Sequence, residues 1–124
     1  MYYRRKVLLA LLESFGGKLE KIRLQKLLLL YCKFQEQPVY HFVPYKFGCF
    51  SFQANADLKT LEKYGQVLED DIVWVKKDQT IYKNLLREKD RKILFSIKHL
   101  YEGKTNTELI KHTYLKYPWF AHRK

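Results

Sequence analysis

The sequence predicts one mainly helical domain with a small β-hairpin. Three segments with apolar residues at helical spacing come first, a stretch rich in β-forming residues follows them, and two more helical segments complete the chain. With a short extended piece between the first two helices, this is the element order of a winged helix-turn-helix. Residues 1–124 contain no internal repeat and no linker rich in Gly, Pro or Ser, so we expect a single domain.

The first two helices are predicted at residues 2–15 and 22–35. The first ends at Gly16-Gly17, because glycine readily adopts the left-handed conformation that closes a helix. Residues 18–20 form the short extended piece. The second helix is apolar nearly all round, which is typical of a helix buried between other elements, so we expect it at the centre of the core.

The third helix is predicted at residues 51–64. It follows an extended run at residues 39–44 and a turn at residues 46–48. Either Ser51 or Asn55 can cap its start, because short polar side chains accept a hydrogen bond from the first free amides of a helix. The third helix and the second are expected to bury five residues together: Leu27, Leu28, Tyr31, Leu58 and Leu61.

The second half of the chain begins with Gly65, which is placed to close the third helix. Residues 66–83 are rich in β-forming residues and predict the hairpin. A fourth helix is predicted at residues 85–101. A fifth helix starts at Thr105, which forms a capping box with Glu108.

The chain is strongly basic, with 24 Lys and Arg against 13 Asp and Glu and a net charge of +11. Such a surface attracts phosphate backbones, acidic proteins or anionic lipid. The longest apolar run, residues 27–32, is far shorter than the roughly 20 residues that cross a bilayer, and the N-terminus lacks a signal-peptide cleavage site. We therefore expect a cytoplasmic protein without a membrane partner, with Cys32 and Cys49 reduced.

The sequence does not predict an enzyme. The candidate metal ligands Cys32, His41 and Cys49 are widely spaced and form no Cys-x-x-Cys or His-x-x-x-His pair. A nucleophile and base made of Cys49 and His41 would lack the third residue that orients the base. Asp70 and Asp71 are adjacent in sequence but have no convergent partner for acid–base work. We expect no catalytic residue, cofactor, metal or small-molecule substrate.

The predicted contact surface is the outward face of the third helix, because this helix of a winged helix enters a groove beside the hairpin. Gln53 and Asn55 can read base edges. Lys46, Lys59 and Lys63 can contact phosphate. The candidate nucleic-acid-binding residues are Tyr45, Lys46, Ser51, Gln53, Asn55, Lys59 and Lys63.

Two segments carry a resemblance to a known family. Residues 23–31 read Arg-Leu-Gln-Lys-Leu-Leu-Leu-Leu-Tyr, and residues 45–51 read Tyr-Lys-Phe-Gly-Cys-Phe-Ser. Together with the Leu61 to Gly65 helix end, they resemble the SocA-like antitoxin (Panacea) domain family over about residues 2–83, although Cys49 replaces the proline usual there. The resemblance implies a compact helical domain of winged-helix character, found as antitoxins, in phage-associated proteins and as an N-terminal module.

Two functions are compatible with these patterns. The first is a DNA- or RNA-binding winged helix with a regulatory or targeting role; the carboxylates of residues 69–71 in the hairpin count against it, because they would repel phosphate. The second is a protein-interaction module of antitoxin or phage-defence type that acts through an exposed aromatic face.

The C-terminal aromatic residues leave a further choice open. Tyr114, Tyr117, Trp119 and Phe120 could stack on bases, but their spacing and Pro118 favour packing on the core. The chain stops soon after these residues without a polar tail, so we expect the domain to be the N-terminal module of a longer protein.

Overall fold

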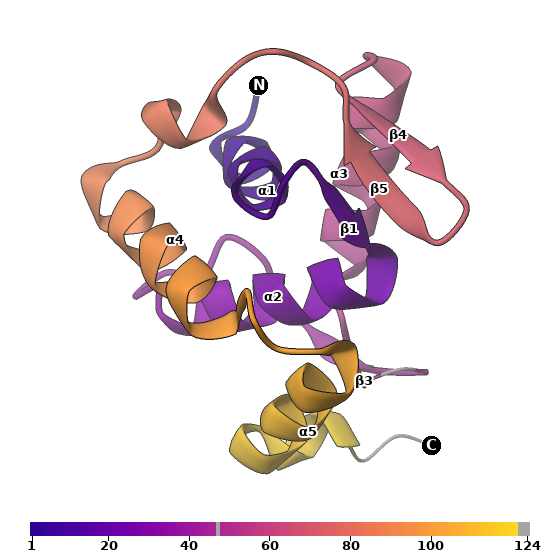
Figure 1. Cartoon of the computed structure of the whole chain (residues 1–124), viewed down its shortest axis with the longest axis vertical. Helices are drawn as coiled ribbons and strands as arrows, with labels where there is room; N and C mark the ends of the chain where they lie inside the picture. The colour runs from indigo at the N-terminus through magenta and orange to yellow at the C-terminus, as the bar shows by residue number, and fades with distance from the viewer. Residues whose placement is uncertain (47, 122–124) are drawn as a thin grey trace.

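The structure is a computed structural model that describes residues 1–46 and 48–121, and it is mostly helical with a small antiparallel sheet (Figure 1). The elements are, in order, α1 (Tyr3–Ser14), β1 (Lys18–Glu20), α2 (Lys21–Lys33), β2 (Val43–Tyr45), β3 (Gly48–Phe50), α3 (Phe52–Lys63), β4 (Val67–Asp70), β5 (Val73–Lys76), the 3-10 turn η1 (Tyr82–Leu85), α4 (Glu88–Tyr101), α5 (Asn106–Lys116) and the 3-10 turn η2 (Pro118–Ala121).

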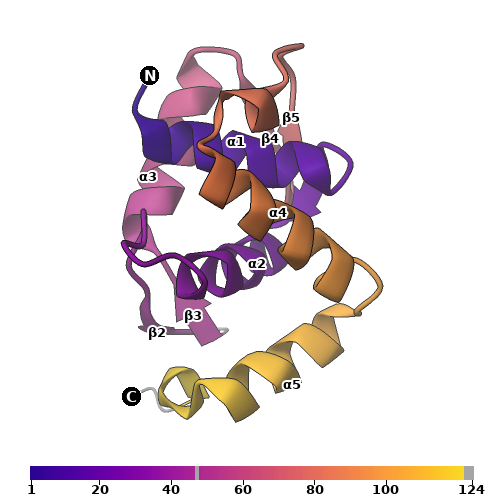
Figure 2. The same cartoon turned by 90° about the vertical axis from the view of Figure 1, so that its left-hand side faces the viewer.

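Helix α2 lies at the centre of the molecule, as its sequence predicts. Every residue from Leu24 to Cys32 is buried, including the polar Gln25 and Lys26. Helices α1, α4 and α5 surround it (Figure 2). Leu27, Leu28, Tyr31, Leu58 and Leu61 all belong to one core cluster, so the predicted joint burial is confirmed.

The sheet joins segments that are far apart in the sequence. Its strand order is β1-β5-β4, and all pairings are antiparallel. Trp74 of β5 lies opposite Leu19 of β1 on one side and Glu69 of β4 on the other. Because Trp74 is only 1% exposed, the sheet contributes a large side chain to the core.

The predicted hairpin is confirmed, but it is shorter than residues 66–83. Its strands end at Lys76, and Tyr82 begins the turn η1 instead of extending a strand. Helix α1 holds the start of this turn, because the Glu13 carboxylate accepts hydrogen bonds from the backbone amides of Tyr82 (2.9 Å) and Lys83 (3.0 Å). The fourth helix accordingly starts at Glu88 and not at residue 85.

A second hairpin, which the sequence did not predict, fills the connection between α2 and α3. Strands β2 and β3 pair across the turn that includes Lys46, so the predicted extended run has a partner. Helix α3 begins directly after β3, with the Ser51 hydroxyl accepting from the Ala54 amide at 3.2 Å. Ser51, and not Asn55, is therefore the cap.

The end of α3 and the loop after α4 provide a matched test of backbone conformation. A Cβ added at Gly65 or at Gly103 would meet no atom within 4 Å, but only Gly65 has a left-handed φ, of +76°. Gly65→Ala should therefore lower the free energy of unfolding by about 1 kcal/mol, because an L side chain is strained at this φ. Gly103→Ala should leave it unchanged or raise it slightly. Urea denaturation of both variants checks this, and equal effects would contradict the assignment of Gly65 as the helix-closing residue.

Candidate functional site

The outward face of α3 carries most of the predicted contact residues. The helix stands at the edge of the molecule and buries Ala54, Asp57, Leu58 and Leu61 (Figure 1). Gln53, Lys59 and Lys63 are exposed, and Asn55 is half-buried. Ser51 is a correction: its side chain is fully buried as the helix cap and does not belong to the contact surface.

Tyr45 and Lys46 are exposed on the β2–β3 hairpin, beside the start of α3. The Tyr45 ring packs against Phe50 (centroids 5.0 Å apart) and Phe52 (5.3 Å). Phe52 is the first residue of α3, so the aromatic cluster joins the hairpin to the helix. The predicted residues from the two segments are thus brought onto one surface, which contains an apolar patch that the sequence did not predict.

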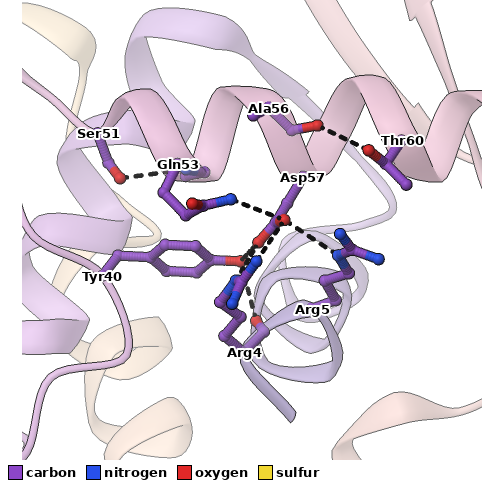
Figure 3. Close-up of polar contacts among 9 residues, drawn as sticks. Arg4, Arg5, Tyr40, Ser51, Gln53, Ala56, Asp57 and Thr60 are labelled. Carbon is purple, nitrogen blue, oxygen red and sulfur yellow. Dashed lines mark hydrogen bonds and ion pairs between the residues drawn. The ribbon is translucent and has the colours of Figure 1, made fainter. Parts of the chain in front are cut away.

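A buried carboxylate that the sequence did not single out organises this region. Asp57, on the inward side of α3, accepts hydrogen bonds from Arg4 (Nε, 2.7 Å; Nη2, 3.1 Å), Arg5 (Nε, 3.0 Å) and the Tyr40 hydroxyl (2.7 Å). Gln53, one turn earlier, donates to the same carboxylate at 3.2 Å. Figure 3 shows these side chains converging from α1, from the segment after α2 and from α3.

The charges of this cluster do not cancel. Burial alone would raise the pKa of Asp57, but the hydrogen bonds from Arg4, Tyr40 and Arg5 outweigh burial and hold the pKa below its ordinary value. Two guanidinium groups then face one carboxylate, so one positive charge stays uncompensated. Both arginine side chains are partly exposed and lie 4.7 Å from the Tyr2 ring centroid, next to α3.

A sequence signal for this cluster existed. Asp57 falls on the apolar stripe of the third helix, between Ala54 and Leu58, where a carboxylate requires a buried cation or donor. The sequence also places Arg4 and Arg5 at the start of the first helix. It does not show that these two segments meet, because that contact depends on the tertiary fold.

On the wing, by which we mean the β4–β5 hairpin, the charges compensate one another. The Glu69 carboxylate pairs with Lys59 of α3 (2.7 Å) and with Lys21 at the start of α2. Hydrogen bonds from Lys21 and Lys59 lower the pKa of Glu69, so it remains charged. Glu69 therefore repels phosphate less than the sequence suggested, but Lys59 is also less available. Asp70 and Asp71 remain exposed at the turn.

A second basic surface, which the sequence did not predict, lies on α4. Lys83, Arg87, Arg91 and Lys98 are exposed, and none of them forms a salt bridge with any residue the structure describes. Phe95, which is 74% exposed, stacks on His99 between them, with centroids 6.3 Å apart. Helix α1 separates this surface from α3 (Figure 1).

The structure also shows the surroundings of the candidate metal ligands and of the two cysteines. Among residues 1–46 and 48–121, no group of three His, Cys, Asp or Glu side chains could hold a metal ion. Cys32 and Cys49 are free and buried, and burial raises the pKa of Cys32 to about 12 and that of Cys49 to about 11, so both stay as thiols at neutral pH. No helix in the described part of the chain has the length and apolar content to span a membrane.

The Asp57 cluster generates a stability prediction. Asp57→Asn should lower the free energy of unfolding by about 3 kcal/mol, because it leaves two partly buried guanidinium groups without a counter-charge. Asp70→Asn is the matched control: it removes a carboxylate from an exposed position and should change stability by about 0.5 kcal/mol or less. Urea denaturation at pH 7 measures both, and an equally small effect at Asp57 would show that the cluster does not hold α1 to α3.

The same two variants should differ in acid. Because folding lowers the pKa of Asp57, the unfolded chain takes up the proton at a higher pH than the folded chain. The stability that this carboxylate supplies is therefore present above its ordinary pKa of about 4 and is lost as the pH falls below that value. The stability of Asp57→Asn should fall less steeply over this pH range than that of the wild type or of Asp70→Asn.

Neither a scan of protein-family models nor searches of curated proteins and solved structures found a match to this chain. The relation to the SocA-like antitoxin domain therefore stays a prediction from its sequence motifs.

Proposed function

We propose that this chain is a nucleic-acid-binding winged-helix module with a regulatory or targeting role. The observation that carries the proposal is the strand order β1-β5-β4, in which the strand between α1 and α2 pairs with the second strand of the hairpin after α3. In a winged helix this arrangement sets α3 in a groove of the duplex and the wing against the neighbouring backbone.

The connection between α2 and α3 departs from a simple helix-turn-helix. That motif uses a turn of about three or four residues, whereas here residues 34–51 contain the β2–β3 hairpin. The hairpin places Tyr45 and Lys46 beside the start of α3, where they extend the proposed contact surface.

The proposed contacts divide by chemistry. Asn55 is an amide that can read base edges, and Gln53 can do so with the amide oxygen and the N–H that its bond to Asp57 leaves free. Lys46 and Lys63 are exposed cations that can contact phosphate. Arg4 and Arg5 add the uncompensated positive charge of the Asp57 cluster at the same edge of α3. Because Asp70 and Asp71 would repel phosphate, the sides of the wing, and not its turn, are expected to approach the backbone.

Neutralising the wing carboxylate tests this surface. Glu69→Gln releases Lys21 and Lys59 from their ion pairs, so it should strengthen duplex binding and steepen the log–log salt dependence by about one unit for each additional phosphate that the freed lysines neutralise. Lys63→Ala should have the opposite effect. Affinities for duplex DNA, single-stranded DNA and RNA, measured over a salt series, give both values.

Glu88→Gln is the charge-matched control. It also removes a carboxylate from an ion pair, with Lys92 at 3.6 Å, but on α4 and away from the wing. It should leave the affinity nearly unchanged. If Glu88→Gln strengthens binding and Glu69→Gln does not, the contact surface is α4 and not α3. If no nucleic acid binds with a salt-dependent affinity even at low ionic strength, the proposed function is wrong.

An apolar groove favours a second function, a protein-interaction module of antitoxin or phage-defence type. The groove measures about 320 Å³ and lies between the start of α2, the β2–β3 hairpin and the wing turn. Ile22, Tyr45, Phe50 and Ile72 are its apolar walls, and its charged lining residues are Glu20, Lys21 and Lys26. Since the chain carries a net charge of +11, the occupant that fits is an apolar side chain on an acidic partner.

The anionic, apolar dye anilinonaphthalene sulfonate is a probe for this groove. Wild-type protein should enhance its fluorescence, and Ile72→Glu should lose much of the enhancement, because the substitution places a negative charge in the apolar wall. Ile81→Glu changes another exposed isoleucine outside the groove and is the control. Equal responses in the two variants would show that the groove does not bind apolar anions.

A further inference from the structure

A separate pocket of about 390 Å³ lies between the C-terminal half of α2, the segment after it and η2. Its volume is in the range of small-molecule binding sites. The floor is made by the buried Leu29 and Cys32. The remaining lining residues are mainly aromatic or basic, and those that carry the argument are Lys33, Lys116, Tyr117, Trp119 and Phe120.

The pocket is positively charged at its mouth. Lys33 and Lys116 are both exposed, and their Nζ atoms lie 4.9 Å and 6.0 Å from the centroid of the same Tyr117 ring. None of the described lining residues carries a carboxylate, and neither lysine forms a salt bridge with a described residue. Lys116 Nζ also lies 5.9 Å from the centroid of the Phe34 ring. Two positive charges on the lining of one pocket attract an anion to it.

The aromatic residues at the chain's end divide into an anchor and a free ring. Phe120 is buried against Leu29 and Cys49, as predicted, but the core packing predicted for Trp119 is wrong. Trp119 is 57% exposed and meets Phe120 edge to face, with centroids 4.9 Å apart. The anchored Phe120 therefore holds η2 in place, and the indole of Trp119 presents free surface at the pocket on which a planar ring can stack.

We propose that this pocket binds a nucleotide, with the base against Trp119 and the phosphate between Lys33 and Lys116. Base-paired nucleotides keep their bases inside the stack, so the ligand is a free nucleotide or an unpaired nucleotide of a strand. The proposal does not depend on α3 or the wing, and it stands even if those elements bind no duplex.

Tryptophan fluorescence reports on the pocket directly. The chain has two tryptophans, and Trp74 is buried in the core, so stacking on Trp119 should quench the accessible part of the emission. AMP should give a saturable quench that weakens with added salt, and adenosine and inorganic phosphate, each lacking half of the ligand, should bind more weakly. A short oligo(dA) compared with AMP distinguishes an unpaired nucleotide in a strand from a free nucleotide.

Matched variants locate the site. Lys33→Ala/Lys116→Ala should weaken AMP binding by about tenfold for each charge-assisted hydrogen bond to the phosphate that is lost. Lys63→Ala/Lys77→Ala removes the same charge outside the pocket and should leave AMP binding unchanged. Trp119→Leu, followed by equilibrium dialysis with labelled AMP, should show the loss of the stacking partner, and circular dichroism checks that the variants remain folded.

Three results would overturn the proposal. The first is the absence of a saturable response to AMP or oligo(dA) at millimolar concentration. The second is an equal loss of affinity in the two double-lysine variants. The third is tighter binding of a phosphotyrosine peptide than of either nucleotide ligand. The last result would assign the pocket to a phosphorylated protein. Duplex affinity measured on the same variants separates this outcome from the proposed function, because only Lys63→Ala/Lys77→Ala should reduce it.

Discussion

The buried carboxylate of Asp57 fixes the relation between the first helix, the segment after α2 and α3. It accepts from Arg4, Arg5 and Tyr40, which come from two separate parts of the chain. The Tyr40 hydroxyl also lies 3.2 Å from the Arg4 carbonyl oxygen, so its single proton, donated mainly to Asp57, is within reach of a second acceptor and the three segments meet at one polar cluster. The exposed face of α3 is therefore oriented by these polar contacts together with the packing of Leu58 and Leu61.

Other carboxylates also hold separate elements together by accepting hydrogen bonds or forming ion pairs. In a chain of net charge +11, this leaves many of the lysines and arginines without an acidic neighbour among the residues that the structure describes. Glu13 holds η1, Glu69 joins the wing to two helices, and Asp90 accepts from Tyr3 (2.7 Å) and Gln35 (3.0 Å). These acidic side chains support internal contacts. Cations such as Arg91, Lys98, Lys33 and Lys116 stay on the surface. The surfaces that carry these lysines and arginines are therefore more basic than the overall composition indicates.

The features that the sequence predicted are those that depend on local chemistry. The periodicity of α2, the closing residue Gly65 and the capping box at Thr105 can each be read from a few neighbouring residues, and each is present. The features that it missed depend on partners distant in the chain. The predicted extent of the hairpin was wrong because Glu13 of another helix holds the start of η1 where the sequence predicted a strand, and the role of Asp57 was overlooked because Arg4 lies far away in the sequence.

In the candidate site too, the features set by neighbouring residues could be predicted, and those set by contacts between distant elements could not. The exposure of Gln53, Lys59 and Lys63 follows from helical spacing, so those positions could be predicted. The burial of Ser51 follows from its capping role, which the sequence left open between Ser51 and Asn55. The ion pair that occupies Lys59, and the pocket below Trp119, arise from contacts between elements that no local pattern encodes.

The pairing of β1 with β5 has a consequence for how the chain is made. Strand β1 has three residues, and its partner β5 is synthesised only after α2, the β2–β3 hairpin and α3 have been completed. During translation, Leu19 therefore emerges from the ribosome long before Trp74 is available to cover it. Helices α1 and α2 can form and meet early because their contacts are local, whereas closure of the sheet is a late step with a large loop to fix. If the ribosome pauses before Lys76, the apolar side chains of the nascent helices stay exposed, because the strand that would bury them has not yet been made.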